Sequence, residues 1–325
     1  MSWFNVDKRG LAKVLARKGK EFIVFELVQN AWDQRVTTVS VTLEPVEGVP
    51  KARMLVEDDD PDGFADLAHA YTLFAGSGKK ADPSKAGRFN LGEKLVLALC
   101  DEATIVSTTG GVRFDKDGRH LLRCKRGSGS SFEGVFPCTR EELQAIDGAL
   151  GQLIPKAGIR TIVNGRPLAP RGLRKSFEAT LPTEVSDAGG NLVRSSRKAT
   201  VEIYEPLPGE NGALYELGIP VVETGDRWHV NVLQKVPLNM DRDNVPPSFL
   251  RKIRVEVLNQ MHAFITREDS NQPWVREASS DRRCSTESIT VVLDKRFGER
   301  RVAYDPSDPE ANSLAVSRGY VVVHG

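Results

Sequence analysis

The strongest constraint on the fold is a change of hydrophobic period near the start of the chain. Apolar residues recur at helical spacing over residues 21–34, and residues 39–43 (VSVTL) then alternate as they do in a half-buried strand. A second short apolar run at residues 52–56 ends in the acidic turn EDDDPDGF. A helix followed at once by two strands predicts an α+β protein in which helices cover a sheet.

The rest of the chain continues this mixture of helices and short strands. Further helices are predicted at residues 6–17, 64–74, 92–100 and 139–150, the last opened by a capping box of Thr139 and Glu142. Strands are predicted at residues 103–107, 112–114, 120–124 and 133–136, and the short turns between them indicate an antiparallel meander. After Pro155 the pattern restarts with strands at 159–163, 199–204, 214–217 and 228–233, a long irregular stretch after the first of them, and a helix from Pro246 to about Thr266.

These patterns divide the chain into three predicted parts. Residues 1–155 form a first domain, and residues 156–267 form a second α+β domain. Residues 268–325 form a linker and a short C-terminal α/β segment, because residues 268–288 are polar and aperiodic. The apolar run YVVV close to Gly325 is compatible with a natural chain that continues further.

Composition excludes several classes of protein. The chain of 325 residues has 45 Lys and Arg against 44 Asp and Glu, so its net charge of +1 gives no global attraction to nucleic acid or anionic membrane. The sequence has neither an apolar run of about 18 residues nor an apolar N-terminal signal segment, which predicts a soluble, cytoplasmic protein without a membrane partner. Its four scattered cysteines indicate a reducing compartment.

A polar stripe marks the helix predicted at residues 21–34. Glu26, Asn30 and Asp33 stand at positions i, i+4 and i+7, so a carboxylate, an amide and a second carboxylate share one face. Most such stripes are ordinary solvated faces, because charged residues normally lie outside the core. The stripe is a candidate ligand site only together with the two segments that follow.

The acidic turn after residues 52–56 is the second candidate segment. Asp58, Asp60 and Asp62 followed by Gly63 partly imitate a calcium-binding EF-hand loop. His69 stands where that loop requires a bidentate Glu, and a strand precedes the turn instead of a helix. The turn therefore presents carboxylates without the pattern of a calcium site.

The third segment is the glycine-rich loop AGSGKKADPSKAGRFNLGEK. It combines glycines, which let backbone N–H groups approach a phosphate, with lysines, an arginine and a predicted helix N-terminus. The residues concerned are Gly76, Gly78, Gly87, Gly92, Lys79, Lys80, Lys85 and Arg88. It is not a P-loop, because Leu73 and Lys80 occupy the positions of its first glycine and its Ser or Thr. A phosphate cradle is favoured, and a flexible surface loop is the alternative.

Taken in order, the segments ELVQNAWD, VEDDDPDGF and GRFNLGEK resemble the N, G1 and G2 boxes of the GHKL ATPases, the superfamily of gyrase B subunits, heat-shock chaperones, histidine kinases and MutL. TIVNGRPL resembles the entry to the S5-like transducer domain of MutL and MORC-type members, and LQKVPLNMDRDN resembles the loop through which that domain reaches the nucleotide. The resemblance covers roughly residues 20–265. It implies a Bergerat-type ATPase domain, with helices on one face of a mixed sheet, followed by an S5-like α+β domain.

The resemblance assigns expected roles to individual residues of the first two boxes. Glu26 matches the glutamate that polarises the attacking water, and Asn30 matches the magnesium ligand. Asp33 matches a nucleotide-contacting position on the same helix. Asp58 matches the aspartate that accepts a hydrogen bond from the adenine amino group, and Gly63 matches the glycine against which the base packs.

The lid and the second domain supply the remaining expected contacts. Gly87, Gly92 and Lys94 match the end of the ATP lid, and Lys79 and Arg88 are further lid residues expected to contact the nucleotide. Lys235 matches the transducer lysine that contacts the γ-phosphate and thereby senses hydrolysis. A solvated surface lysine is the alternative interpretation of Lys235.

The sequence departs from the family pattern in two places. Asp60 stands where the G1 box has its first glycine and an extra residue precedes Gly63, so either Asp58 or Asp59 could be the adenine ligand. Asn90 replaces a glycine of the lid, and asparagine tolerates left-handed backbone better than most residues. The dispersed histidines offer no phosphoacceptor, which argues against the histidine-kinase branch.

The resemblance therefore implies an ATP- and Mg²⁺-dependent ATPase. Slow hydrolysis would drive lid closure, movement between the domains and ATP-dependent homodimerisation. Two alternatives remain open: a nucleotide-binding clamp or scaffold without hydrolysis, and an S5-like nucleic-acid-binding module. Basic clusters such as Arg171, Arg174 and Lys175 leave nucleic-acid binding open.

Overall fold

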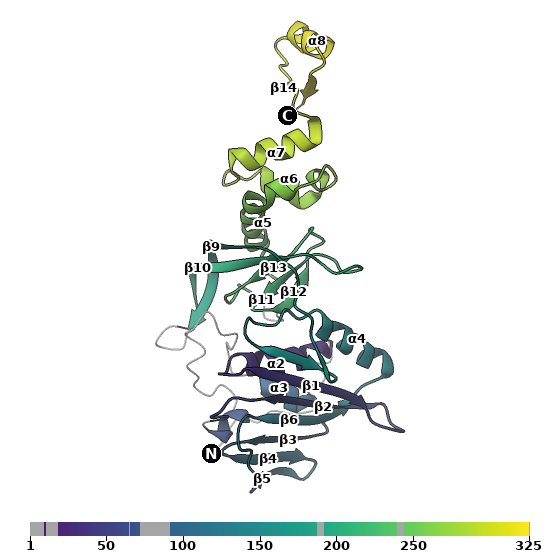
Figure 1. Cartoon of the computed structure of the whole chain (residues 1–325), viewed down its shortest axis with the longest axis vertical. Coiled ribbons are helices and arrows are strands. Elements are labelled where there is room, and N and C mark those ends of the chain that lie inside the picture. Colours follow the sequence, from purple (N-terminus) through teal and green to yellow (C-terminus); the bar gives the residue numbers. More distant parts are fainter. Residues whose placement is uncertain are drawn as a thin grey trace.

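The computed structural model describes residue 10 and residues 19–64, 66–71, 92–186, 192–238 and 244–324. These residues form an elongated molecule (Figure 1) in which a large sheet lies at one end and a second sheet lies in the middle. A small strand–helix–strand unit lies at the other end. The mixed α+β class predicted from the sequence is confirmed.

The described residues place eight strands in the first sheet, in the order β5-β4-β3-β6-β2-β1-β7-β8. The strands are β1 (Thr38–Pro45), β2 (Lys51–Asp58), β3 (Glu102–Ser107), β4 (Gly110–Asp115), β5 (Gly118–Leu122), β6 (Ser131–Pro137), β7 (Arg160–Val163) and β8 (Arg166–Pro167). Neighbouring strands in the described part of the sheet are antiparallel, apart from β1 and β7, which are parallel.

Helices cover one face of this sheet. Helix α2 (Glu21–Trp32) contacts both α3 (Gly92–Leu99) and α4 (Arg140–Gly151), and each of these helices contacts the sheet. Alternate residues of β1 and β2 are buried under them, as the period-2 pattern predicted. The predicted capping box of α4 is present, because Thr139 Oγ1 accepts from Glu142 N at 3.2 Å and Glu142 accepts from Thr139 N at 2.8 Å.

The predicted meander is correct for β3, β4 and β5 and wrong for β6. Strand β6 pairs with β3 and β2, and so lies in the middle of the sheet instead of beside β5. The burial pattern gives the reason: β6 buries Phe132 and Phe136 on one face, whereas nearly every residue of β5 is exposed. The more apolar strand occupies the central position, and the polar strand becomes the edge.

The predicted domain border at residue 155 falls before the last strands of the first sheet. Strand β7, expected to open the second domain, pairs in parallel with β1, Val39 facing Thr161. Trp32 Nε1 at the end of α2 donates to Thr161 Oγ1 at 3.1 Å, and this bond is buried. Residues 160–167 therefore complete the first sheet.

The second sheet consists, in the described residues, of five strands in the order β12-β11-β13-β10-β9. They are β9 (Leu173–Ser186), β10 (Leu192–Tyr204), β11 (Ala213–Glu216), β12 (Ile219–Glu223) and β13 (His229–Val232). Strand β9 lies in the stretch predicted to be irregular, where Pro182 and several charged residues obscure the alternation of Ala179, Leu181 and Val185. Pro182 is tolerated because β9 is an edge strand.

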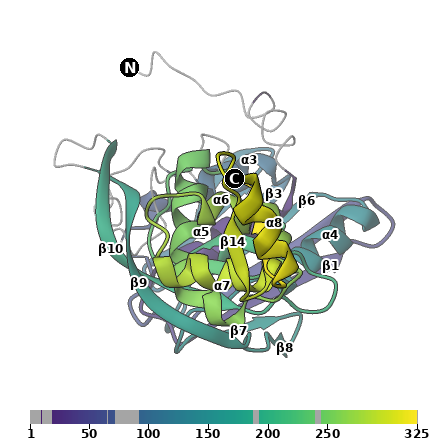
Figure 2. The ribbon, with the colours of Figure 1, turned by 90° about the horizontal axis from the view of Figure 1, so that it is seen from above.

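Helices pack on the second sheet and continue past the predicted domain end. Helix α5 (Pro247–Met261) is followed by the 3₁₀ turns η4 (His262–Phe264) and η5 (Asp269–Asn271), α6 (Pro273–Ser279) and α7 (Thr286–Phe297). Figure 2 shows the β9–β10 ribbon curving around these helices. Trp274, Val275, Ala278 and Val292 are buried in the second core, so the prediction of a linker from residue 268 is wrong.

The remaining elements agree with the sequence pattern where they are described. Strand β14 (Arg301–Ala303), helix α8 (Pro309–Ser317) and strand β15 (Val321–Val323) form the predicted strand–helix–strand segment, with β14 parallel to β15. Of the helix predicted at 64–74, the structure describes the 3₁₀ turn η2 (Leu67–Ala70), and the helix predicted at 6–17 lies outside the described residues apart from residue 10. No helix in the described ranges is long and apolar enough to cross a membrane.

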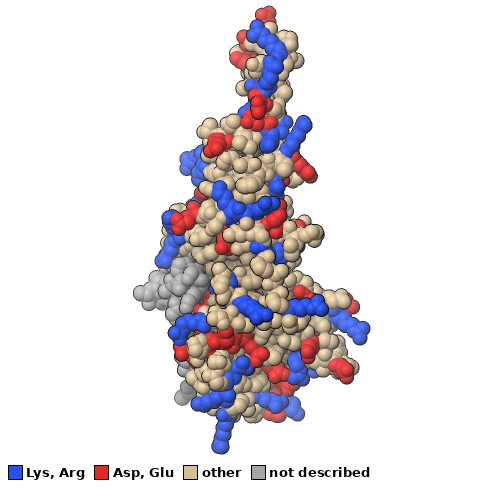
Figure 3. All heavy atoms as spheres, in the orientation of Figure 1, with Lys and Arg blue, Asp and Glu red and all other residues tan. Residues whose placement is uncertain are grey.

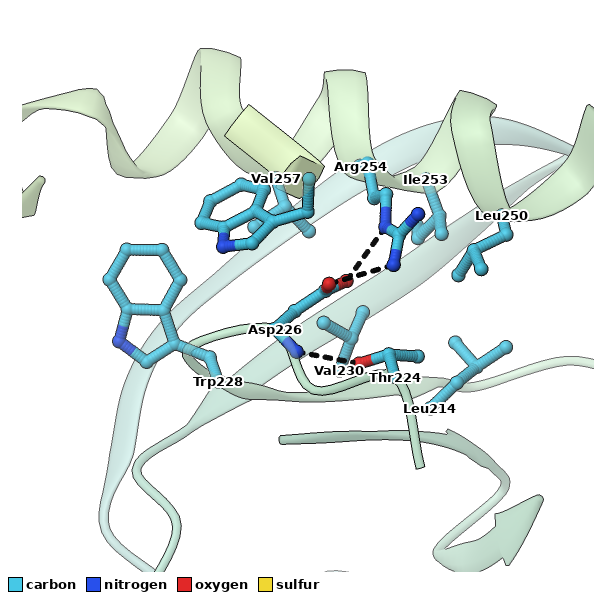
Figure 4. Close-up of a pocket in the computed structure, with 10 residues that line it drawn as sticks. Leu214, Thr224, Asp226, Trp228, Val230, Leu250, Ile253, Arg254 and Val257 are labelled. Atoms are coloured by element: carbon cyan, nitrogen blue, oxygen red, sulfur yellow. Dashed lines mark hydrogen bonds and ion pairs between the residues drawn. The ribbon is translucent and has the colours of Figure 1, made fainter. Parts of the chain in front are cut away.

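A buried ion pair locks α5 onto the second sheet (Figure 4). Arg254 on α5 binds Asp226, in the loop between β12 and β13, through two hydrogen bonds of 2.9 and 2.8 Å. Its remaining nitrogen donates to Glu277 on α6 at 2.7 Å. Burial raises the pKa of Asp226 despite the opposing effect of Arg254, so the carboxylate depends on this partner to stay charged.

We predict that Arg254→Met lowers the free energy of unfolding by about 3–5 kcal/mol, because it leaves the buried Asp226 carboxylate unpaired. The matched control is Arg251→Met, which removes an exposed guanidinium that pairs with the same Glu277 at 3.1 Å. The control should change stability by less than about 1 kcal/mol. Urea unfolding followed by circular dichroism measures both, and equal effects of the two variants would contradict the assignment.

Candidate functional site

A cavity lies between α2, the end of β2 and the central strands β3 and β6. The space between these elements is about 560 Å³ with open solvent included. Its lining consists of Leu27, Asn30, Ala31, Gln34, Val56, Asp58, Asp60, Gly63, Phe64, Ile105, Ser130, Ser131 and Phe132. Apolar side chains form most of the wall, and the polar groups come from α2, the acidic turn and the residues that precede β6.

The face of α2 that meets the cavity differs slightly from the predicted stripe. Leu27, Asn30 and Ala31 line it from one face of α2, at the spacing i, i+3 and i+4, and Gln34 lines it from the chain two residues after the helix ends. Glu26 is half-buried and precedes Asn30 by one helical turn, outside the residues that line the described cavity. Asn30 is thus in the cavity as expected, and Gln34 is a lining residue that the sequence interpretation missed.

Asp33 does not join this face. Its side chain is fully buried at the C-terminal end of α2, and its carboxylate pairs with Lys156 Nζ at 3.1 Å. Lys156 also donates to the backbone carbonyl of Trp32 at 3.3 Å. Asp33 thus forms a buried ion pair outside the cavity lining, which includes the neighbouring Gln34.

Asp58 is one of the two carboxylates that line the cavity, and Asp60 is the other. It ends β2, and its Oδ1 accepts hydrogen bonds from the backbone N–H groups of Asp60 at 3.0 Å and Ser130 at 3.1 Å. In the described part of the chain, Oδ2 of Asp58 has no hydrogen-bond partner. Burial raises the pKa of Asp58, and the two backbone bonds oppose that rise only in part.

Asp59 is engaged on the opposite side of the turn. Its carboxylate accepts from Thr37 N at 2.8 Å, Thr37 Oγ1 at 2.5 Å and Thr38 N at 3.0 Å, and so caps the start of β1. Burial would raise the pKa of Asp59, but these hydrogen bonds together lower it. Of the two aspartates between which the sequence left the choice open, Asp58 lines the cavity and Asp59 does not.

Glycines allow the two loops of the site to approach each other. Gly63 has φ +60°, and a Cβ there would lie 2.3 Å from Ser107 Oγ. Gly129 has φ +74°, and a Cβ there would lie 1.9 Å from the Asp58 carbonyl oxygen. Both positions therefore exclude any other residue in this geometry.

A group of serines supports the acidic turn, and sequence reasoning missed it. Ser107 Oγ accepts from Phe64 N at 2.7 Å and lies 3.2 Å from Ser130 Oγ. Ser107 ends β3, and Ser130 precedes β6. The signal was the GSGSS run at residues 127–131, which joins two predicted strands and is too short to suggest a ligand site alone.

The predicted lid cannot be compared residue by residue. Lys79, Gly87 and Arg88 lie outside the described residues, as do Arg242 and Asp243 near the second domain's expected loop. Helix α3 begins at Gly92, where the sequence predicted a helix N-terminus, and the backbone of Lys94 is in its first turn. The side chain of Lys94 is outside the description.

The second sheet and the helices packed on it are called the second unit below. Lys235 lies in this unit, three residues after β13 ends, and is 1% exposed. The alternative that it is a solvated surface lysine is therefore wrong. In the described ranges, no three His, Cys, Asp or Glu side chains gather where they could hold a metal ion.

The basic clusters of the second unit are largely paired with acids. Arg171 is buried and binds Glu210 through bonds of 2.6 and 2.8 Å, which lower the pKa of Glu210 to about 2. Arg174 pairs with Glu205 at 2.9 Å. On the face shown in Figure 3, positive and negative side chains are interspersed along the molecule. These arginines form structural pairs.

Comparison with known proteins gives a distant likeness. No protein-family model matches the chain, and no curated protein matches it. Among solved structures, it is similar to the ATPase region of Saccharomyces cerevisiae topoisomerase II, with 11% identity and a TM-score of 0.39. The match covers 62% of this chain and 62% of that one, and a likeness this distant assigns no function.

We predict opposite stability effects for the two aspartates at pH 7. Asp58→Asn should stabilise the protein, because a carboxylate whose folded pKa is raised destabilises the native state above that pKa. Asp59→Asn should destabilise it, on the order of 1 kcal/mol, because a carboxylate with a lowered folded pKa contributes stability at neutral pH.

Urea unfolding at pH 7 and at stepwise lower pH measures both effects. The gain in Asp58→Asn should shrink as the pH falls through the raised pKa of Asp58. The loss in Asp59→Asn should shrink as the pH falls through the lowered pKa of Asp59. Effects of the same sign in the two variants would be incompatible with the geometry described.

Proposed function

We propose that the protein is an ATP- and Mg²⁺-dependent ATPase of the GHKL type, with the adenine base in the cavity beside α2. The observation that carries this proposal is Asp58, whose Oδ1 is held by two backbone N–H groups at the wall of an otherwise largely apolar cavity. A flat base with an amino group fits such a cavity, because its rings take the apolar wall and its amino group donates to the carboxylate. Leu27, Ile105 and Phe132 provide that wall.

The position of Asn30 supports a place for the phosphates and the metal ion on the same helix. An amide oxygen is a hard ligand that suits Mg²⁺, which usually takes one or two protein ligands and completes its shell with phosphates and water. Bound Mg²⁺ would neutralise charge on the phosphates, and Asn30 would orient them.

The segment that leads into α3 is proposed to act as a lid over the phosphates. Backbone N–H groups at the start of α3 favour an anion, so the phosphates would extend from Asn30 toward Gly92. Lys79, Gly87, Arg88 and Lys94 are proposed to complete this contact. Lid closure, movement of the second unit and homodimerisation in the ATP state belong to the proposal as consequences of nucleotide binding.

Hydrolysis is assigned to Glu26 and Lys235. Glu26 is on the rigid α2, one turn before Asn30, where its carboxylate can take a proton from the water that attacks the γ-phosphorus. The new bond joins water oxygen to phosphorus, the bond to the β-phosphate oxygen breaks, and ADP and phosphate result. Lys235 would contact the γ-phosphate from the second unit, and turnover would be slow.

One observation favours a second candidate, a nucleotide-binding clamp without hydrolysis. Asp60 occupies the first glycine position of the G1 box and is 4% exposed, so the cavity carries a second buried carboxylate. Turnover of the wild-type protein distinguishes the two candidates. The alternative of a nucleic-acid-binding module has no comparable support, because Arg171 and Arg174 are engaged by Glu210 and Glu205.

We predict that Glu26→Ala binds ATP as the wild type does and hydrolyses it about 10²–10⁴-fold more slowly, because the carboxylate acts on water and not on the nucleotide. Asn30→Ala should instead weaken the binding of ATP in the presence of Mg²⁺. Calorimetric affinity and phosphate release under single-turnover conditions measure the two effects. Unchanged turnover in Glu26→Ala would remove this residue from the base role.

A further inference from the structure

The segment that carries Lys235 is fixed from two different strands. Thr183 Oγ1 on β9 donates to the Lys235 backbone carbonyl at 2.7 Å. Glu216 Oε2 on β11 accepts from Val236 N at 2.7 Å. The peptide group that joins Lys235 to Val236 is thus held at its carbonyl by Thr183 and at its N–H by Glu216, two side chains from different strands of the second sheet.

The two side chains that hold this peptide group are both buried, although both are polar. Thr183 is fully buried and Glu216 is 2% exposed. Burial of a carboxylate is costly unless hydrogen bonds or charge compensate it, and an apolar residue at this position of β11 would avoid that cost. The carboxylate therefore fits a role in fixing the segment of Lys235 and Val236 more readily than a role in core stability.

The strand that holds this segment also contacts the helix of the candidate site. Directly after Glu216, the turn of Leu217 and Gly218 accepts a hydrogen bond from Ile154 N to Gly218 O at 3.0 Å. A Cβ on Gly218 would lie 2.2 Å from the Ile154 carbonyl oxygen and 3.1 Å from the Trp32 ring, at φ +87°. Trp32 is the last residue of α2, on which Glu26 and Asn30 stand.

We propose that Glu216 is a positioning residue for Lys235, with Thr183 as its second support. Glu216 fixes the Lys235 segment, and two residues later the same chain rests on the end of α2. A short, buried connection therefore runs from the Lys235 segment through β11 to the end of α2. This inference rests on the proposed function, because it concerns the approach of Lys235 to a nucleotide on α2.

A positioning role and a general structural role of Glu216 have different effects on turnover, ADP affinity and stability. Misplacing a contact to the γ-phosphate should lower kcat and spare ADP affinity, because ADP lacks that phosphate. A loss of folding would instead lower both and would lower the midpoint of unfolding. The amide oxygen of glutamine can still accept from Val236 N, so the conservative variant should rescue activity.

The experiment compares steady-state ATP hydrolysis, ADP affinity and thermal unfolding for Glu216→Ala, Glu216→Gln and Thr183→Val. The matched control is Glu223→Gln, at the exposed end of β12 in the same sheet, where the carboxylate pairs with Asn211 at 3.2 Å. We expect kcat to fall about 10- to 100-fold in Glu216→Ala and less in Thr183→Val, with KM and ADP affinity within about twofold of wild type. Glu216→Gln should keep most of the turnover, and the control should match wild type.

Lys235→Ala, measured in parallel, tests the role of Lys235 separately from the positioning role of Glu216. If Lys235→Ala retains wild-type turnover, the proposed role of Lys235 fails and the inference fails with it. If Lys235→Ala is slow but folded Glu216→Ala and Thr183→Val turn over normally, the positioning role is overturned and the proposed function stands. A Gln variant as slow as the Ala variant would also overturn the acceptor role of Glu216.

Discussion

The structure of the candidate site depends on one carboxylate oxygen. Oδ1 of Asp58 accepts the backbone N–H groups of Asp60 and Ser130, which are 2 and 72 residues away along the chain. This arrangement joins the end of β2 to the loop that leads into β6, and the glycine at position 129 permits the approach. The carboxylate stays in the cavity at the cost of a raised pKa. Carboxylates with a pKa shifted by burial are common in sites that bind a ligand.

Helix α2 contacts both the candidate site and the second unit. Its C-terminal half provides Leu27, Asn30 and Ala31 to the cavity, and its last residue, Trp32, contacts the turn at Gly218. This turn directly follows β11, whose Glu216 accepts a hydrogen bond from Val236 N, next to Lys235. The two units are thus joined by side-chain contacts of defined geometry.

Local signals explain which features could be predicted from the sequence. The period of α2, the alternation of β1 and β2 and the capping box of α4 each depend on neighbours within a few residues. Long-range pairings could not be predicted in this way. The insertion of β6 beside β2, the parallel pairing of β7 with β1 and the ion pair of Asp33 with Lys156 join residues far apart in the chain.

The choice between Asp58 and Asp59 illustrates the same limit at the site. Adjacent aspartates have the same chemistry in the sequence, and only the position of Thr37 shows that Asp59 caps β1.

The most direct test of the proposed adenine site is the affinity for ATP and GTP with Mg²⁺, measured by calorimetry on wild type and Asp58→Asn. Wild type should bind ATP more tightly than GTP, because the base of GTP presents a carbonyl where adenine has its amino group. Asp58→Asn should lose about 10- to 100-fold in ATP affinity, because a charged hydrogen bond contributes roughly 1.5–3 kcal/mol. Equal affinity for the two nucleotides, or unchanged ATP binding in the variant, would contradict the proposed adenine site.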